Sequence, residues 1–490
     1  MKTLQVLLST VLLVKLAGCA DFDQEVADRC ERDPHSCGLP DPTAPVITQS
    51  SQSAQEVPSQ GTVTLSVEAQ DDETPQLDFS WTASIGTVEV HASTGSTSEV
   101  VWTAPLCVPS NIPATVTVRV DNRGTSASKT FDLSSEACRI LAVSAGDNHS
   151  LALRSDGTVW AWGDNSSGQL GNGTKDPQPV VLPVQVSGLT DVVAVAAGAS
   201  HSLAKSRDGT VWAWGANDDG QLGDGTSLEQ IRPVQVAVLT DVTAVVASAN
   251  YSLALRGDGT VWAWGDNDLG QIGDGTDKDR AVPKRVEKLV GIFISTVVVG
   301  DDHSLALSRE GDVWAWGYND FGEIGTAEDV QAIPERMSGV TGVKALASGN
   351  GHSLALREDG TVLAWGDNSE GQLGYDPEAT VNTPVKVPGL EGITALAAGA
   401  EFSLALTGDG TVWAWGINTV GELGIGTDAP RGLPRKVPGL VDIKVLAAGD
   451  AHALVLQGDG TVWAWGANDS GQLGDGDAVD TQVPVKTLSP

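Results

Sequence analysis

Five histidines at equivalent positions of a repeated segment are the residues best suited to metal chemistry. They are His149, His201, His303, His352 and His452. A ring of imidazole nitrogens, with Asp147, Asp301 and Asp302 close by in sequence, could hold a transition metal. In two further repeats, however, Tyr251 and Phe402 occupy the same position. The pattern therefore favours a half-buried aromatic wedge in each repeat, and we expect no metal.

Two other arrangements could carry chemistry, and neither has the required spacing. The aspartate box of sialidases needs Ser-x-Asp-x-Gly-x-x-Trp, whereas here Ser155, Asp156 and Gly157 are contiguous. The acidic turn at 274–277 lacks the alternating ligands of a calcium loop. No Ser/His/Asp constellation can be assembled from spacing alone. We therefore expect no catalytic residues, no cofactor and no enzymatic activity.

The cysteines indicate export. Apart from Cys19, the chain has Cys30, Cys37, Cys107 and Cys138, an even number that suggests two disulfides with three possible connectivities. Closing short loops costs least entropy, which favours Cys30–Cys37 and Cys107–Cys138. A zinc site with four cysteine ligands would need paired C-x2-C spacing, and the sequence has none.

The first residues resemble a bacterial lipoprotein signal. Leu4–Val14 is an apolar stretch too short to span a bilayer, and Leu16-Ala17-Gly18-Cys19 is similar to a lipobox. The resemblance implies that residues 1–18 are removed and that Cys19 is acylated. An ordinary secretory signal is the alternative. Residues 19–43, rich in acids and proline, are expected to be a tether, which would place the protein at the outer membrane or cell surface through a lipid anchor.

The charge balance excludes some partners and suggests another. The 490 residues include 63 acidic and 29 basic side chains, for a net charge of −34. Such a chain is a poor match for nucleic acid or for an anionic lipid surface. It suggests a protein partner with a basic surface, although solubility alone would explain the charge. We expect a monomer.

Residues 44–138 are predicted to form a small β-sandwich. Runs such as 62–67 and 115–120 alternate polar and apolar residues with period two, and turn-prone clusters separate them. Trp81 and Trp102 are expected in its core. The segments FSWTASIGTV and VVWTAP resemble immunoglobulin-like domains of bacterial surface proteins. That resemblance implies a spacer or adhesion module.

Seven copies of one unit fill residues 139–490. DGTVWAWG or a close variant begins at Asp156, Asp208, Asp258, Glu310, Asp359, Asp409 and Asp459, a period near 50 residues. A period of this length with strand-like content is typical of a β-propeller. The Asp-Gly pair favours a type I′ hairpin. Trp160 and Trp162 alternate with Val159 and Ala161, so the tryptophan face of one blade should fit the small-residue face of its neighbour. Each unit then has a Gly-x-Asn turn whose amide should bond local backbone.

The stretch WAWGDNSSGQLGNGT closely resembles the repeat of the regulator of chromosome condensation family. The resemblance implies an all-β fold with a seven-bladed β-propeller, here preceded by the immunoglobulin-like β-sandwich. We expect the first strand, near Ile140, and the last, near Pro484, to lie together and close the ring. The family's founding member is a guanine-nucleotide exchange factor, but export, the acidic charge and the uniform repeats argue against that role here. A plant photoreceptor relative carries tryptophan in a Gly-Trp-Arg-His-Thr context, which this chain lacks.

Positions that vary between repeats are free to specify a partner. The candidates for partner binding are Leu269, Tyr318, Phe321, Tyr375 and Val420. Ordinary loop filler is the alternative for these apolar residues. We therefore predict a non-catalytic protein–protein interaction scaffold displayed at the bacterial cell envelope. Carbohydrate binding or hydrolysis by the propeller is the alternative function, and nucleotide exchange is a remote one.

Overall fold

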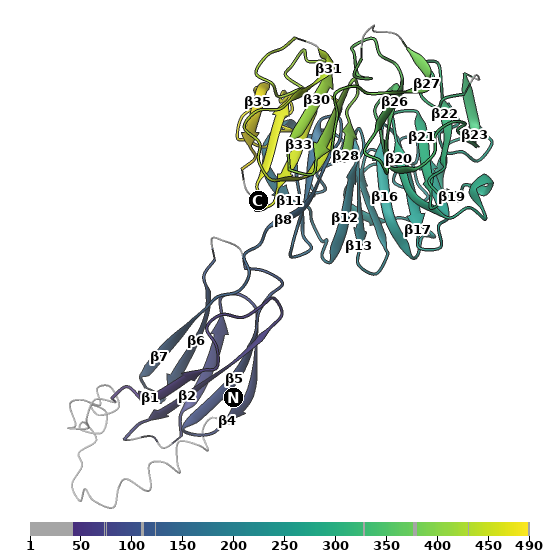
Figure 1. Ribbon diagram of the computed structural model, residues 1–490. Coiled ribbons are helices and arrows are strands. Elements are labelled where there is room, and N and C mark those ends of the chain that lie inside the picture. Colours follow the sequence, from purple (N-terminus) through teal and green to yellow (C-terminus); the bar gives the residue numbers. More distant parts are fainter. Residues whose placement is uncertain are drawn as a thin grey trace, which may run out of the picture. The chain divides into compact units, whose positions relative to one another are not determined.

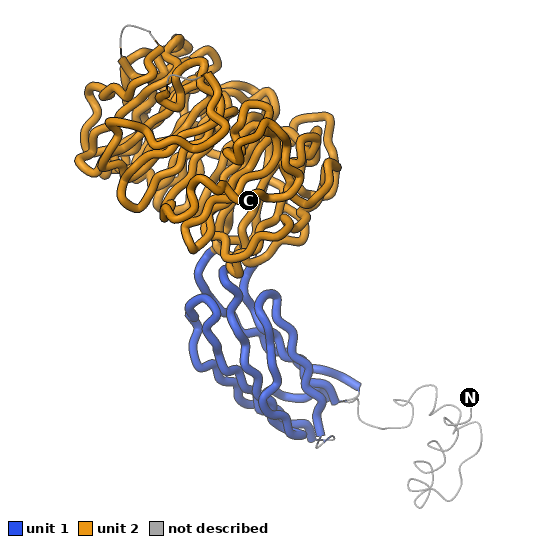
Figure 2. Tube along the Cα trace, turned by 90° about the vertical axis from the view of Figure 1, so that its right-hand side faces the viewer, with its two compact units in different colours: residues 1–137 blue, residues 138–490 orange. Residues whose placement is uncertain are grey.

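The computed structural model describes residues 43–488 except 73, 75, 109–111, 123, 327–328, 376–379 and 430. The chain divides into two compact units, Met1–Ala137 and Cys138–Pro490, which Figure 2 colours separately. The predicted signal peptide at 1–18, residues 19–42 of the predicted tether, Cys19, Cys30 and Cys37 lie outside the described residues. A search of the described part of the chain found no helix with the length and hydropathy needed to cross a membrane.

The first unit contains two antiparallel sheets, with strand orders β1-β2-β5-β4 and β3-β6-β7. The strands are β1 (Val46–Gln52), β2 (Thr62–Gln70), β3 (Asp78–Ala83), β4 (Thr87–Ser93), β5 (Thr97–Thr103), β6 (Ala114–Asp121) and β7 (Ser126–Leu133). Alternate residues of β2 and β6 are buried, as their period-two sequence predicts.

One core joins the two sheets of this unit. Trp102 is fully buried and donates its indole N–H to the Ile85 carbonyl at 2.8 Å. Trp81 is half-buried and stacks on Phe131, with ring centroids 6.0 Å apart. Both tryptophans pack into or against the same hydrophobic cluster. The unit is therefore a β-sandwich, while its immunoglobulin-like character stays a prediction.

The second unit is a β-propeller of seven four-stranded antiparallel sheets within its described residues (Figure 1). Each sheet is a blade of four consecutive strands. The first strand of each blade contacts the first strand of the next, and β32 of the seventh blade contacts β8 of the first. The blades therefore form a closed ring.

The first and second strands of the blades form the inner part of the ring. The first strands are β8 (Ile140–Ala145), β12 (Val192–Ala197), β16 (Val242–Ser248), β20 (Ile294–Val299), β24 (Val343–Ser348), β28 (Ile393–Ala398) and β32 (Ile443–Ala448). The second strands are β9 (His149–Arg154), β13 (His201–Ser206), β17 (Tyr251–Arg256), β21 (His303–Ser308), β25 (His352–Arg357), β29 (Phe402–Thr407) and β33 (His452–Gln457).

The third and fourth strands complete each blade toward its outer edge. The third strands are β10 (Val159–Asn165), β14 (Val211–Gly215), β18 (Val261–Gly265), β22 (Val313–Tyr318), β26 (Val362–Gly366), β30 (Val412–Gly416) and β34 (Val462–Gly466). The fourth strands are β11 (Asp176–Gln185), β15 (Gln230–Gln235), β19 (Arg280–Arg285), β23 (Val330–Arg336), β27 (Val381–Lys386), β31 (Arg431–Lys436) and β35 (Thr481–Lys486). A short 3-10 helix, η2 (Glu287–Leu289), follows β19.

The Asp-Gly hairpins differ from the type I′ turn that the sequence favours. Gly157 has a φ of 79°, but Asp156 is not among the residues with positive φ. Gly157 N donates to Arg154 O at 2.9 Å, and Arg154 N donates to Thr158 O at 2.9 Å. This is a type I turn followed by a glycine bulge, so the I′ prediction is wrong. The Asp156 carboxylate, which accepts from Thr158 N at 3.0 Å, holds the turn instead.

Each blade is attached to its predecessor by an indole hydrogen bond. The second tryptophan of the first blade, Trp162, is fully buried and donates its N–H to the Gln472 carbonyl of the seventh blade at 2.8 Å. The equivalent donors of the other blades are Trp214, Trp264, Trp316, Trp365, Trp415 and Trp465. The first tryptophan of the motif, such as Trp160, is only half-buried. The alternation of residues along the third strand therefore buries one indole per blade in the interface with the preceding blade. We call each interface between neighbouring blades a seam.

The repeated histidines also bridge blades. His149 Nε2 lies 2.8 Å from Ser202 Oγ, which donates its single hydrogen to Gln169 O at 2.9 Å. Nε2 must then carry the proton. The same bond joins His201 to Ser252, His303 to Ser353, His352 to Ser403 and His452 to Ser150. Phe402 cannot make this bond. Phe402 packs against the seventh blade, and there Ala453 takes the place of the serine.

This geometry confirms the wedge interpretation of the histidines and corrects their exposure. All five have no exposed surface, so they are fully buried rather than half-buried. Burial lowers the pKa of the His149 imidazole to about 4, which leaves the ring neutral at pH 7. The Nε2 atoms of the five histidines each lie within hydrogen-bond distance of a serine hydroxyl in the next blade.

The ring closes by packing between the first and seventh blades, and each of the two blades keeps a complete sheet of its own. β8 is hydrogen-bonded to β9 in the first blade, and β35 is hydrogen-bonded to β34 in the seventh. The first and last strands therefore belong to different sheets. Closure depends on packing of β8 against β32 and β33. We predicted that the first and last strands lie together, and Val485 of β35 does pack against the cluster that contains Ile140 of β8. The two strands belong to different sheets because each blade is built from contiguous strands.

A double-mutant cycle on His149 and Ser202 tests whether the hydrogen bond between these residues stabilises the packing of neighbouring blades. Ser202→Ala should lower the free energy of unfolding by about 1–3 kcal/mol, because the buried Nε2–H loses its acceptor. Adding His149→Phe should restore most of that loss, since Phe402 opposite Ala453 is the same combination in another seam. Urea unfolding of the four proteins measures the coupling. A double variant as unstable as the sum of the single variants would contradict this account.

Candidate functional site

The loops at one end of the strands form a face that we call the channel face. It contains the loops between first and second strands and the loops that follow third strands. Asp164 N donates to Asn148 O at 2.8 Å, and this bond fastens the two loops of the first blade together. The Asp-Gly hairpins lie at the other end of the strands, on what we call the hairpin face.

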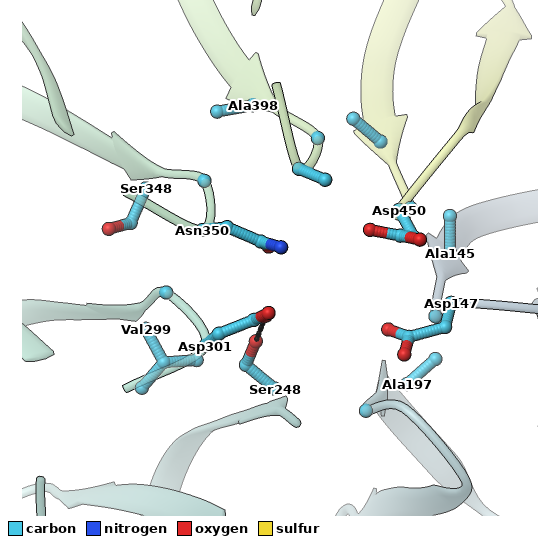
Figure 3. A pocket seen from close by; sticks show the side chains of 18 of the residues that line it. Ala145, Asp147, Ala197, Ser248, Val299, Asp301, Ser348, Asn350, Ala398 and Asp450 are labelled. Atoms are coloured by element: carbon cyan, nitrogen blue, oxygen red, sulfur yellow. Dashed lines mark hydrogen bonds between the residues drawn. The ribbon is translucent and has the colours of Figure 1, made fainter. Parts of the chain in front are cut away.

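A narrow channel opens at the centre of the channel face (Figure 3). Backbone hydrogen bonds connect neighbouring blades around it, from Ala199 N to Ala249 O, Asn350 N to Ala400 O and Ala400 N to Asp450 O. The cavity has a volume of about 90 Å³ and is lined largely by glycine and alanine. That volume holds a few water molecules and excludes a larger ligand.

Three carboxylates point into this channel. They are Asp147, Asp301 and Asp450, and the Asn350 amide joins them (Figure 3). Burial raises the pKa of Asp301 to about 7, with a further contribution from the charges of Asp147, Asp302 and Asp450. Burial and the charge of Asp450 raise the pKa of Asp147 to about 6. The channel therefore favours protons or cationic groups, which would relieve this repulsion.

Other carboxylates of the channel face lie close to one another. Burial and neighbouring carboxylates raise the pKa of Asp219, Asp266, Asp302 and Glu401. The charges of Asp266, Asp279, Asp218 and Asp268 all contribute at Asp219. These carboxylates therefore repel one another, whereas elsewhere on the same face Lys175 pairs with Glu229 and Arg280 pairs with Asp274.

The hairpin face shows the opposite electrostatics. Its carboxylates pair with bases, as in Arg154–Asp156, Arg336–Asp312 and Lys444–Asp442. Hydrogen bonds from nearby threonines lower the pKa of Asp208, Asp258, Asp359, Asp409 and Asp459. The two faces thus differ in how their charge is compensated, although both contain many aspartates.

Two groups of described residues bring possible metal ligands together. Carboxylate oxygens of Asp266, Asp268 and Asp279 lie within 4.8 Å of one another on the channel face and could hold a cation. The other group depends on the sulfur atoms of Cys107 and Cys138, which are both disulfide-bonded and offer no thiolate.

The acidic turn at 274–277 is occupied by its own side chains. Asp274 Oδ1 accepts from Thr276 N and Oγ1, and Asp274 Oδ2 pairs with the Arg280 guanidinium. Hydrogen bonds to Thr276 and Arg280 lower the pKa of Asp274. Its carboxylate therefore stabilises the loop.

The structure places the residues predicted to bind a partner at different depths. Tyr318 ends β22 and its ring meets the Phe321 ring edge-on, with centroids 6.4 Å apart. Phe321 is 42% exposed. Leu269 and Val420 are half-buried in the corresponding turns of other blades. Tyr375 packs against a hydrophobic core cluster. The five residues are therefore spread over several blades, with one aromatic pair among them.

Glu323 near this pair and two residues of the channel, Asn350 and Asp450, were not predicted as site residues. Glu323 replaces the glutamine of most repeats, is fully buried, and accepts from Phe321 N at 2.9 Å. Burial raises its pKa to about 7. Asn350 and Asp450 stand two residues before a histidine, as Asp147 does. That shared repeat position was a signal that could have identified them.

Comparison with known proteins gives concordant matches over the second unit. Residues 191–489 match the model of the RCC1-like domain, and residues 156–204 and 140–169 match two models of the regulator of chromosome condensation (RCC1) repeat. The ultraviolet-B receptor UVR8 of Arabidopsis thaliana is 33% identical over 212 residues, which are 42% of this chain and 48% of the receptor. The probable E3 ubiquitin-protein ligase HERC6 of Homo sapiens is 36% identical over 211 residues, 43% of this chain and 16% of the ligase. The chain thus spans less than half of these relatives.

Solved structures match a larger part of the chain. Prp20p of Saccharomyces cerevisiae, studied with its binding to Gsp1p and histones, has a TM-score of 0.62 and 27% identity, covering 72% of this chain and 88% of that one. Human WBSCR16 has a TM-score of 0.61 and 26% identity, covering 68% of this chain and 94% of that one.

The channel carboxylates should make the propeller less stable as the pH rises. Folded Asp301 keeps its proton up to about pH 7, whereas the unfolded chain loses it near the ordinary value of 3.8. The contribution of protonated Asp301 to the free energy of unfolding is therefore complete below about pH 4, and it is lost as the pH rises to about 7. Asp301→Asn should raise the Tm by about 2–5 °C at pH 7.5 and much less at pH 5, measured by calorimetry.

Asp359→Asn on the hairpin face is the matched control. Hydrogen bonds from Thr361 lower the pKa of Asp359, so its stabilising contribution to the folded state is present at both pH 5 and pH 7.5. This variant should lower the Tm at both. If the two substitutions changed the Tm in the same way at both pH values, the claim that the channel carboxylates repel one another would be refuted.

Proposed function

The chain belongs to the family of the RCC1-like domain, and from this premise we propose that its propeller is a non-catalytic protein-binding scaffold that engages a basic partner through the channel face. The observation that carries the proposal is the mutual repulsion of carboxylates on that face, which raise one another's pKa values. A basic surface would neutralise this repulsion on binding. The related Prp20p, described with its binding to Gsp1p and histones, indicates that this fold supports protein binding.

The aromatic pair on the fourth blade supplies the apolar part of such an interface. Phe321 leaves 42% of its surface in water, and Tyr318 Oη donates to Asp320 Oδ2 at 2.6 Å. Aromatic side chains beside charged groups are the usual energetic centre of an interface. The repeats also suit this role, because the buried tryptophans and histidines fix the scaffold while the loops are free to vary.

We further propose that the protein is displayed at the bacterial cell envelope as a monomer anchored by lipid on Cys19. The lipobox-like Leu16-Ala17-Gly18-Cys19 and the even number of remaining cysteines support this location. The first unit would then serve as a spacer between membrane and propeller.

Affinity capture from envelope extract tests the binding function. The chain from residue 20 serves as bait, and mass spectrometry identifies retained proteins. Combined Tyr318→Ala and Phe321→Ala substitutions should reduce retention of a stoichiometric partner at least tenfold, since interface anchors are worth about 2 kcal/mol or more each. Val441→Ala is the matched control, because Val441 is an apolar residue of the hairpin side with 66% exposure. Retention of no protein, or equal loss in the control, would refute the proposal and turn attention to glycans.

Metabolic labelling tests the anchor separately. Cells fed an alkyne-tagged fatty acid should incorporate the tag into the wild-type protein, and Cys19→Ala should abolish incorporation. Wild-type protein without the tag, recovered from the soluble fraction, would show ordinary secretion instead.

A further inference from the structure

One of the seven seams contains a lysine at a position that is leucine in the other six. The fifth residue of each second strand packs toward the following blade. Six of these residues are leucines that are at most 5% exposed and belong to a seam cluster: Leu153, Leu255, Leu307, Leu356, Leu406 and Leu456. In β13 the residue is Lys205, which pairs in register with Val211 as Leu255 pairs with Val261. The cluster of that seam contains Leu203 but no second leucine from β13.

The fourth blade shows that the scaffold itself does not call for this lysine. Residues 201–209 read HSLAKSRDG and residues 303–311 read HSLALSREG, so the two segments differ only at Lys205 and in the choice of acid at the hairpin. A charged side chain in an apolar seam costs stability that a leucine would provide. A residue kept at such a cost in one repeat of seven indicates a role other than folding.

Lys205 lines an open pocket of about 410 Å³ on the hairpin face, between the second and third blades. We call it the Lys205 pocket. Its charged lining consists of three basic and three acidic side chains: Lys205, Arg207, Arg256, Asp208, Asp241 and Asp258. A volume of this size lies in the range of small-molecule sites.

Two of the three basic groups of the pocket have unused hydrogen-bond donors. Among the described residues, the side chains of Lys205 and Arg207 form no hydrogen bond and no ion pair, whereas Arg256 donates to Thr240 O at 2.8 Å. Burial lowers the pKa of the Lys205 ammonium, the charge of Asp208 opposes this shift, and that of Arg207 adds to it. The ammonium therefore lies partly out of water, where a bound anion would stabilise its charge.

The acidic groups of the pocket each keep one oxygen for a ligand. Asp208 Oδ1 accepts from Thr210 N at 2.9 Å, and Asp258 Oδ1 accepts from Thr260 N at 3.0 Å. The Oδ2 atoms of both aspartates accept no hydrogen bond among the described residues. A simple anion would leave these acceptors unused and be repelled by them, and a neutral ligand would leave the Lys205 ammonium unpaired. A ligand with one carboxylate and several hydroxyl donors satisfies both kinds of group.

We propose that the Lys205 pocket binds a hydroxylated organic acid of monosaccharide size, such as a sugar acid. The carboxylate of the ligand accepts charge-assisted hydrogen bonds from the Lys205 ammonium and the Arg207 guanidinium. Its hydroxyls donate to the unused oxygens of Asp208 and Asp258. The pocket lies on the hairpin face, so it is independent of partner binding by the channel face.

Calorimetric titration of the chain from residue 20 with glucuronate tests the site. We expect saturable binding to one site with a Kd of about 1 mM or tighter, the range open to so small a ligand. Glucuronamide, which keeps the shape and lacks the charge, should bind at least about tenfold more weakly. Cyclohexanecarboxylate, which keeps the charge and lacks the hydroxyls, should also bind at least about tenfold more weakly.

Restoring the leucine of the other repeats separates binding from folding. Lys205→Leu should abolish glucuronate binding and raise the Tm by about 2–4 °C, because the new side chain fills the seam as Leu307 does. Arg207→Gln should weaken binding at least about tenfold. Arg309→Gln is the matched control, since Arg309 holds the same hairpin position in the fourth blade, and it should leave the affinity within about twofold.

Four results would overturn the proposal. They are the absence of saturable glucuronate binding, equal affinity for glucuronate and either of its two analogues, unchanged affinity in Lys205→Leu, and an equal loss of affinity in Arg309→Gln and Arg207→Gln. A Tm of Lys205→Leu at or below that of the wild type would contradict the claim that the lysine is kept at a cost to the fold.

Discussion

The propeller depends on one contact repeated around a ring, in which a blade donates a buried indole N–H to a carbonyl of the blade before it. For the first blade this bond runs from Trp162 to Gln472, so it also joins the beginning of the array to its end. Because the donor and the acceptor belong to different blades, no blade can satisfy its own tryptophan. The histidine–serine bonds obey the same rule. A buried polar group without its partner costs about 1–3 kcal/mol, so these contacts make completion of the ring a condition for stability.

That constraint explains where variation is tolerated. Residues in the seams must match a neighbour across the blade boundary, as the replacement of histidine by Phe402 together with serine by Ala453 illustrates. Loop residues of the channel face have no such obligation, and there the chain accumulates carboxylates that repel one another. On the hairpin face the aspartates have structural partners and cap the turns. Many carboxylates near the channel are therefore free to serve recognition, whereas those of the hairpins, like Asp274 in its loop on the channel face, contribute to folding.

The sequence predicted the propeller well because its signals are local and repeated. Each of these signals depends on a few neighbouring residues: the period of the motif, the alternation around Trp162 and the Gly-x-Asn turn. The prediction that the amide of this turn bonds local backbone is confirmed at Asn165. The failures have physical causes of other kinds. The turn type depends on Asp156 bonding Thr158, which competes with the positive φ that the pair Asp-Gly suggests. The packing of the seventh blade against the first and the approach of Asp147 to Asp450 involve residues about three hundred positions apart, and only the closed ring brings them together.

Ring closure also brings together residues from the two ends of the repeat array. Ile140, Ala152 and Trp162 of the first blade share one hydrophobic cluster with Leu454, Leu456 and Leu473 of the seventh. The hydrogen bonds of the last seam are all available, and Trp162 makes its bond as the other indoles do. The bond from His452 to Ser150 crosses the same boundary between the seventh and first blades. The two ends of the array are therefore held in register by the same kinds of contact that join blades within it, and closure needs no strand exchanged between the end blades.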